Sequence, residues 1–158
     1  MLPQYISDAA ANARRYAKMK NLTTEKVFGY GQEGYVLQTN KMTAVKAFYF
    51  PQHFRQELEV YQYLKLWRIT EVAGFHIPQL ISHVDQLKII EMTVVAAPFI
   101  VDFVGARIDL PFDREDGWLA NTMDLFENDW DRVKFAIWEL EKHGVYLSDI
   151  HPGNIRCG

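Results

Sequence analysis

The sequence predicts an α+β fold in which an antiparallel sheet comes first and helices follow. Short runs of β-type residues lie on both sides of a glycine-rich turn, and a further run follows at residues 42–50. Turns join these runs directly, which is typical of hairpins. Apolar residues then recur at helical spacing in residues 52–67 and again in residues 130–140.

Composition limits the class of protein. The 158 residues predict one domain, or one and a fraction, and 49% hydrophobic residues are enough for a packed core. A net charge of -3 gives no reason to expect a nucleic-acid partner. The single cysteine, Cys157, excludes an internal disulfide and fits a reducing, cytoplasmic location. No apolar run approaches a membrane span, and the N-terminus lacks the hydrophobic core of a signal peptide.

The first segment, residues 4–20, is predicted to be a helix. Ile6, Ala10, Ala13 and Ala17 recur at spacings of four, three and four, so they share one face. We expect this face to pack on the domain that follows.

Glycines punctuate the next segment in the pattern Gly-x-Gly-x-x-Gly-x-Val, at Gly29, Gly31, Gly34 and Val36. Glycine permits a sharp turn and a close approach of the backbone to a ligand. The pattern alone is a weak signal, and a dinucleotide-binding fold would need a helix to start within the glycines. The residues after Gly34 instead favour a strand.

Lys46 and Glu57 are two charged residues that each lie among apolar neighbours. Lys46 follows Ala44 and Val45 in an apolar strand, where a lone lysine usually lies at an edge with its amine in water. Glu57 lies inside the helical stripe, which consists of Phe54, Leu58, Tyr61 and Leu64. An unpaired buried carboxylate is costly, so Lys46 is its natural partner; a glutamate at the margin of the stripe, reaching solvent, is the alternative.

The middle and the end of the chain predict a second hairpin and two helices. Residues 80–84 and 87–94 form the hairpin, and residues 109–117 form a loop before a weak helix at 118–126. Asn128 or Asp129 is expected to cap the last helix, and Gly144 to end it. The buried stripe of this helix is predicted to be Trp130, Val133, Ile137 and Leu140.

An Asp-x-x-x-x-Asn segment follows that helix. A Pro-Gly step between Asp149 and Asn154 forces a tight turn that can bring both side chains toward one space. An aspartate can orient a hydroxyl and accept its proton, and an asparagine oxygen can hold Mg²⁺. A surface Asx turn is the alternative explanation for this segment taken alone.

The order of these motifs resembles the protein-kinase-like superfamily: glycine hairpin, Ala-Val-Lys, glutamate in the next helix, long helix, Asp-x-x-x-x-Asn. The Asp-x-His-Pro-x-Asn form is most similar to bacterial atypical kinases and small-molecule phosphotransferases. The resemblance covers residues 24–156. It implies a helical extension at 1–23, an antiparallel-sheet N-lobe with an αC-type helix at 24–95, and a hinge with a truncated helical C-lobe at 96–158.

The resemblance also implies a site for ATP and Mg²⁺. The glycine loop would cover the phosphates, and Lys46, set by Glu57, would hold them. Asp149 would be the catalytic aspartate, and Asn154 would bind the metal. The remaining residues implied at the nucleotide are Val36, Ala44, Ile90, Glu91 and Met92, with Ile90 behind the adenine and the hinge starting at Glu91.

Some features depart from the family pattern. Leu147-Ser148 stands where His-Arg is common, and His151 stands where lysine is common. The family's second metal-binding aspartate, in its Asp-Phe-Gly motif, has no counterpart before Gly158. Three hypotheses follow: a compact kinase-like phosphotransferase, a pseudokinase that binds nucleotide or acts as a scaffold, and a fragment of a longer kinase. The acceptor, protein or small molecule, stays open. Aromatic residues such as Trp118, Trp130 and Trp138 are expected either to cover the truncated edge or to form a homodimer.

Overall fold

The computed structural model describes residues 1–158, which divide into two compact units. The first unit consists of residues 1–58 and 79–94, and the second of residues 59–78 and 95–158. The predicted α+β class, with an antiparallel sheet followed by helices, is confirmed. The sequence-based domain boundaries stay a prediction. No helix is long and apolar enough to cross a bilayer.

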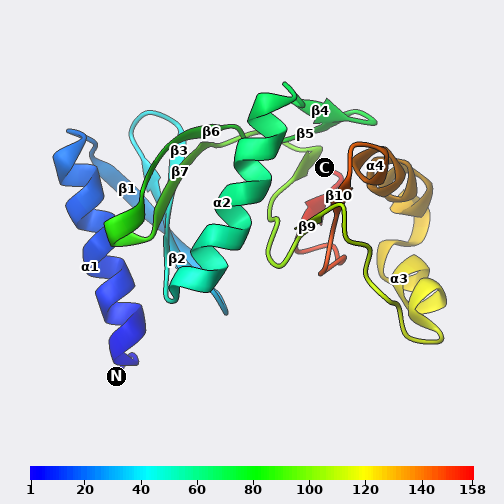
Figure 1. The fold of residues 1–158 in the computed structure, drawn as a ribbon, viewed down its shortest axis with the longest axis horizontal. Coiled ribbons are helices and arrows are strands. Elements are labelled where there is room, and N and C mark those ends of the chain that lie inside the picture. Colours follow the sequence, from blue (N-terminus) through cyan, green and yellow to red (C-terminus); the bar gives the residue numbers. More distant parts are fainter. The chain divides into compact units, whose positions relative to one another are not determined.

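The first unit is built on a five-stranded antiparallel sheet (Figure 1). Every neighbouring pair is antiparallel, in the order β1-β2-β3-β7-β6. Short turns join the first three strands, as the sequence predicts. The strands are β1 (Thr24–Tyr30), β2 (Gly34–Thr39), β3 (Thr43–Phe48), β6 (Leu80–Val84) and β7 (Ile89–Thr93).

Helix α1 (Gln4–Met19) covers one face of this sheet (Figure 1). The predicted apolar face is confirmed, because all four of its residues are buried, and Ala9 and Tyr16 extend it. From the sheet, the residues that pack in the same core are Tyr35, Leu37, Val45, Ala47 and Ile89. Since side chains alternate along a strand, the residues between them point to the opposite face.

Helix α2 (Pro51–Leu66) follows β3 and contributes residues to both units. The predicted stripe is confirmed: Phe54, Leu58, Tyr61 and Leu64 are buried. Glu57 is buried with them, whereas Glu59 is exposed, as the helical spacing predicts.

The second unit contains two helices and two small sheets. Helices α3 (Trp118–Phe126) and α4 (Trp130–Lys142) are joined by the 3₁₀ turn η2 (Glu127–Asp129). The predicted stripe of α4 is buried, and Gly144 (φ 84°) follows the end of the helix, as predicted. Strand β10 pairs with β9, and the second sheet has the order β11-β8-β5-β4. These strands are β4 (Glu71–Val72), β5 (Phe75–His76), β8 (Phe99–Ile100), β9 (Arg107–Ile108), β10 (Val145–Tyr146) and β11 (Ile155–Arg156).

Two local predictions need correction. The expected side-chain cap of α4 is absent: Asp129 occupies the N-cap position but makes no side-chain cap hydrogen bond, because η2 runs directly into the helix with helical backbone angles. Leu87 lies in the turn rather than in a strand. The turn is a 3₁₀ helix, η1 (Asp85–Leu87), followed by Lys88 in the left-handed region (φ 53°).

Candidate functional site

The glycine-rich turn between β1 and β2 is a tight, closed loop. The Gly31 amide donates a 2.9 Å hydrogen bond to the Gly34 carbonyl. Gly34 is buried, and a Cβ atom there would lie 2.9 Å from the Ala47 carbonyl oxygen and 3.2 Å from Lys46 Cε. The third glycine of the motif is therefore required by close packing of β2 on β3. No atom lies within 4 Å of a Cβ built on Gly31.

Tyr49 anchors this loop from the residue that follows β3. Its hydroxyl lies 3.0 Å from the carbonyl oxygen of Gly31 and 3.1 Å from that of Gly34, so its single proton is shared between two acceptors. The Tyr49 amide also donates to the Glu33 carbonyl at 3.0 Å. Burial raises the pKa of the Tyr49 phenol. Sequence reasoning missed this role, because a tyrosine at the end of a strand carries no pattern that distinguishes it from a core residue.

Several predicted nucleotide-site residues share one face of the sheet, opposite α1. Val36, Lys46 and Ile90 are directly paired across β2, β3 and β7. Ala44 and Met92 are paired in the adjacent row. The strand register thus brings together five of the residues that the resemblance implies.

The predicted ion pair between Lys46 and Glu57 is present. Lys46 Nζ lies 3.0 Å from Glu57 Oε1, and the residues are 6% and 1% exposed. The Lys46 ammonium also lies 4.7 Å from the centre of the Phe48 ring, a cation–π contact. Lys46 is therefore not an edge lysine with its amine in water. It lies on the inner strand β3, and its ammonium is held by Glu57 of α2.

Glu91 lies on the other face of the sheet from Lys46. It pairs with Val45 across the sheet, and its carboxylate accepts a 2.7 Å hydrogen bond from the Tyr16 hydroxyl of α1. Burial raises the pKa of Tyr16 to about 12. The backbone role implied for Glu91 and Met92 stays a prediction.

The Asp-x-x-x-x-Asn segment lies in the second unit as a loop between β10 and β11. Both backbone groups of Asn154 are hydrogen-bonded. Its N–H donates to the His151 carbonyl, and its carbonyl accepts from the Val101 N–H, each at 2.9 Å. The Asn154 side-chain nitrogen donates to the Asp149 carbonyl at 3.0 Å. The amide oxygen of Asn154 therefore faces away from this contact and can act as a ligand.

The His151 ring lies beside the Asp149 carboxylate. The Gly153 amide donates to His151 Nδ1 at 2.9 Å, so in the neutral ring the proton is on Nε2. Nε2 lies 3.2 Å from Asp149 Oδ2. A Cβ on Gly153 would lie 2.6 Å from His151 Cε1, so this glycine is needed for the ring to fit.

Arg114 holds the chain that leads into Asp149. Its guanidinium donates to the Ser148 carbonyl at 3.0 Å and to the Leu147 carbonyl. It is stacked against Trp118 and Phe112, at 4.5 and 5.2 Å from the ring centres. Burial lowers the pKa of Arg114. Nothing in the sequence distinguishes Arg114, because it lies in an acidic loop more than thirty residues before its partners.

Metal ligands are few. No group of three or more His, Cys, Asp or Glu side chains could hold a metal ion. At the loop, the oxygen donors are the Asn154 amide oxygen and the exposed Asp149 carboxylate, one oxygen of which lies 3.2 Å from His151 Nε2. Such a set fits Mg²⁺ only where phosphate oxygens and water complete the shell.

No protein-family model matches the chain, and comparison with curated proteins gives no match. Among solved structures, it is similar to APH(2'')-IIa in a ternary complex with streptomycin and ATP (TM-score 0.43, 15% identity). It is also similar to the ADP-bound aminoglycoside phosphotransferase APH(2'')-Ib (0.43, 17%) and to APH(2'')-IIa with gentamicin (0.40, 15%). These matches cover 61%, 55% and 61% of this chain, but only 30%, 28% and 29% of the other chains. Similarity at this level carries no inference about what this chain binds.

Proposed function

We propose that the first unit binds the phosphates of ATP and that the chain belongs to a kinase-like phosphotransferase. The observation that carries the proposal is the buried ion pair between Lys46 and Glu57, on the sheet face next to Gly34. A buried lysine fixed by a carboxylate points in a set direction, which is what positioning of phosphoryl groups requires.

The sheet register supports the same assignment for the apolar residues. Val36 and Ala44 would pack on the nucleotide base, and Ile90 would lie behind it. The loop from Gly29 to Gly34 would cover the phosphates, with its shape set by Tyr49. The absence of a side chain at Gly34 keeps the backbone next to Lys46, so both would approach the same phosphate groups.

The loop of the second unit would supply the groups for transfer. The Asp149 carboxylate, which lies beside the His151 ring, would accept the proton of an acceptor hydroxyl. The hydroxyl oxygen would then form the new bond to the γ-phosphorus, while the bond from that phosphorus to the β,γ-bridging oxygen breaks and ADP leaves. The Asn154 amide oxygen would bind Mg²⁺ together with the phosphates. The acceptor is a protein or a small molecule.

A nucleotide-binding pseudokinase is the second candidate. It is favoured by the small number of metal ligands: the side chains offer no three-residue acidic or histidine cluster. Phosphoryl transfer depends on metal-stabilised charge, so weak metal binding would leave a protein that binds nucleotide without transferring phosphate.

The test is calorimetric titration with ATP, with and without Mg²⁺. Lys46→Met is compared with the wild type, and Lys46→Met/Glu57→Leu provides a variant that leaves no buried carboxylate behind. We expect wild-type binding that strengthens with Mg²⁺ and is lost in both variants. Binding that depends on Lys46 but ignores Mg²⁺ supports the pseudokinase. Equal ATP binding by the wild type and by the folded double variant would overturn the phosphate assignment of Lys46.

A further inference from the structure

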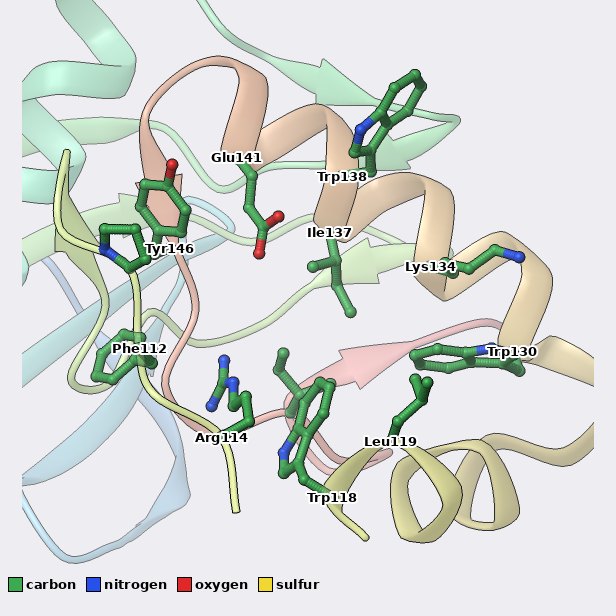
Figure 2. A pocket seen from close by; sticks show the side chains of 12 residues that line it. Phe112, Arg114, Trp118, Leu119, Trp130, Lys134, Ile137, Trp138, Glu141 and Tyr146 are labelled. Carbon is green, nitrogen blue, oxygen red and sulfur yellow. The ribbon is translucent and has the colours of Figure 1, made fainter. Parts of the chain in front are cut away.

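A pocket of about 370 Å³ lies in the second unit, between α4, α3 and the loop that precedes α3 (Figure 2). Its walls contain three of the four tryptophans of the chain, Trp118, Trp130 and Trp138. Leu119 and Ile137 complete the apolar side. The volume and the mostly apolar lining are those of pockets that take small organic molecules.

Three charged side chains line the pocket, and two of them already have partners. Lys134 Nζ lies 3.6 Å from the Asp131 carboxylate. Arg114 is tied to two backbone carbonyls and is stacked on aromatic rings. Both positive groups of the pocket therefore already have an acceptor nearby, although each keeps further N–H donors.

Glu141 is the exception. Its carboxylate points into the pocket (Figure 2) and makes no hydrogen bond or ion pair within 4.0 Å. Burial raises the pKa of the Glu141 carboxyl, and the charge on Arg114 lowers it. The side chain thus presents a negative charge, without a direct partner, in surroundings made mostly of aromatic and aliphatic groups.

We propose that this pocket binds a small organic cation, an ammonium group joined to an apolar ring. The ammonium would pair with Glu141, and the ring would pack among Trp118, Trp130 and Ile137. Aromatic rings attract cations through their electron-rich faces. In this same unit Lys142 Nζ already lies 3.6 Å from the centre of the Trp138 ring.

The position of the pocket links an occupant to the Asp149 loop. Tyr146 and Ile150 line the pocket and lie on either side of the segment that carries Asp149. Arg114, also in the wall, bonds to the carbonyls of Leu147 and Ser148. A bound ligand would therefore rigidify this loop. An effect on phosphate transfer rests on the proposed function, whereas binding itself does not.

The test is a titration of the full chain with three probes of similar shape: 2-phenylethylamine, 2-phenylethanol and 3-phenylpropionate. Tryptophan fluorescence reports occupancy, since three of the four tryptophans line the pocket, and calorimetry gives the affinity. We expect saturable binding of the ammonium probe, about tenfold or more tighter than either of the others. Glu141→Gln should remove this preference, and Glu115→Gln, an exposed glutamate in the loop before α3, should retain it.

Other outcomes overturn the proposal. Tighter binding of the carboxylate probe would mean that Arg114 and Lys134 govern the pocket. Equal binding of all three probes would show that Glu141 does not determine which ligand binds. A preference for the ammonium probe that survives in folded Glu141→Gln would show the same. Absence of saturable binding would show that the pocket is not a site. None of these results depends on ATP, so failure of the ATP titration leaves this test intact.

Discussion

The Tyr16 hydroxyl donates a 2.7 Å hydrogen bond to the Glu91 carboxylate and so joins α1 to the inner strand β7. Tyr16 is fully buried and Glu91 is 5% exposed. The N-terminal helix therefore does more than cover apolar surface, because it also supplies the hydrogen-bond donor that a buried carboxylate needs.

Tyr16→Phe should destabilise the protein by about 1.5–3 kcal/mol, the usual loss for a hydrogen bond to a charged group. The phenyl ring stays, so the change isolates the hydroxyl. The measurement is urea unfolding at neutral pH. Tyr5→Phe is the matched control on the same helix, since Tyr5 is 44% exposed and its contacts with Tyr49 and Phe50 are made by the ring; it should change stability by less than about 0.5 kcal/mol.

The burial of Tyr16, together with this bond, predicts a dependence on alkaline pH. The pKa of Tyr16 is raised to about 12 in the folded protein, against about 10 in an unfolded chain. Below about pH 10 both states keep the proton, and the stabilisation is complete. As pH rises further, the unfolded state releases its proton first, so the stabilisation is lost by about pH 12. The stability difference between wild type and Tyr16→Phe should therefore shrink over this range, and a constant difference would contradict the assignment.

Gly34→Ala should destabilise the first unit by about 1–3 kcal/mol, the range for overpacked sites. The new methyl group would lie 2.9 Å from the Ala47 carbonyl, which is backbone and cannot rotate away, and close to the Lys46 stem. Gly31→Ala is the control, because nothing lies within 4 Å of its Cβ position. Thermal unfolding of the two variants checks the prediction; equal losses would show that loop flexibility, rather than contact at Gly34, sets the effect.

The ion pair predicts an asymmetry between single and double variants. Lys46→Met should lower the free energy of unfolding by about 3–5 kcal/mol, because it removes the ammonium that lies beside the buried Glu57 carboxylate. Lys46→Met/Glu57→Leu should lose less than the single variant, since no buried charge remains. Lys41→Met, at an exposed lysine, should be within about 0.5 kcal/mol of wild type. A double variant that loses as much as Lys46→Met, or more, would contradict a direct coupling.

Prediction from the sequence succeeds where the buried residues recur at a regular spacing. The helical stripes of α1, α2 and α4 were recognisable because apolar residues recur every three or four positions. The pair of Lys46 and Glu57 followed from a carboxylate placed inside such a stripe. That inference combined the general requirement for a partner to a buried charge with the glycine motif and Lys46 upstream.

The contacts that sequence reasoning missed have no periodic signal. Tyr16 and Glu91 are 75 positions apart, and Arg114 is 34 positions from Ser148. Each depends on how distant elements pack, and a single tyrosine or arginine looks the same in any context. The two-residue strands of the second unit, such as β9 and β10, are also too short to show an alternation of apolar and polar residues.

Arg114→Met should loosen the loop that carries Asp149. The variant loses two hydrogen bonds to the Leu147 and Ser148 carbonyls, and we expect the loop to open more easily by about 1–3 kcal/mol. Hydrogen exchange of a peptide covering residues 145–156 measures this directly, with about tenfold faster exchange for each 1.4 kcal/mol. Arg132→Met is the control. Arg132 is half exposed, and its 3.3 Å bond goes to the carbonyl of Cys157, which lies outside residues 145–156. Unchanged protection of residues 145–156 in a folded Arg114→Met protein would mean that β10 and β11 alone hold the loop, and Arg114 would then have no part in placing Asp149.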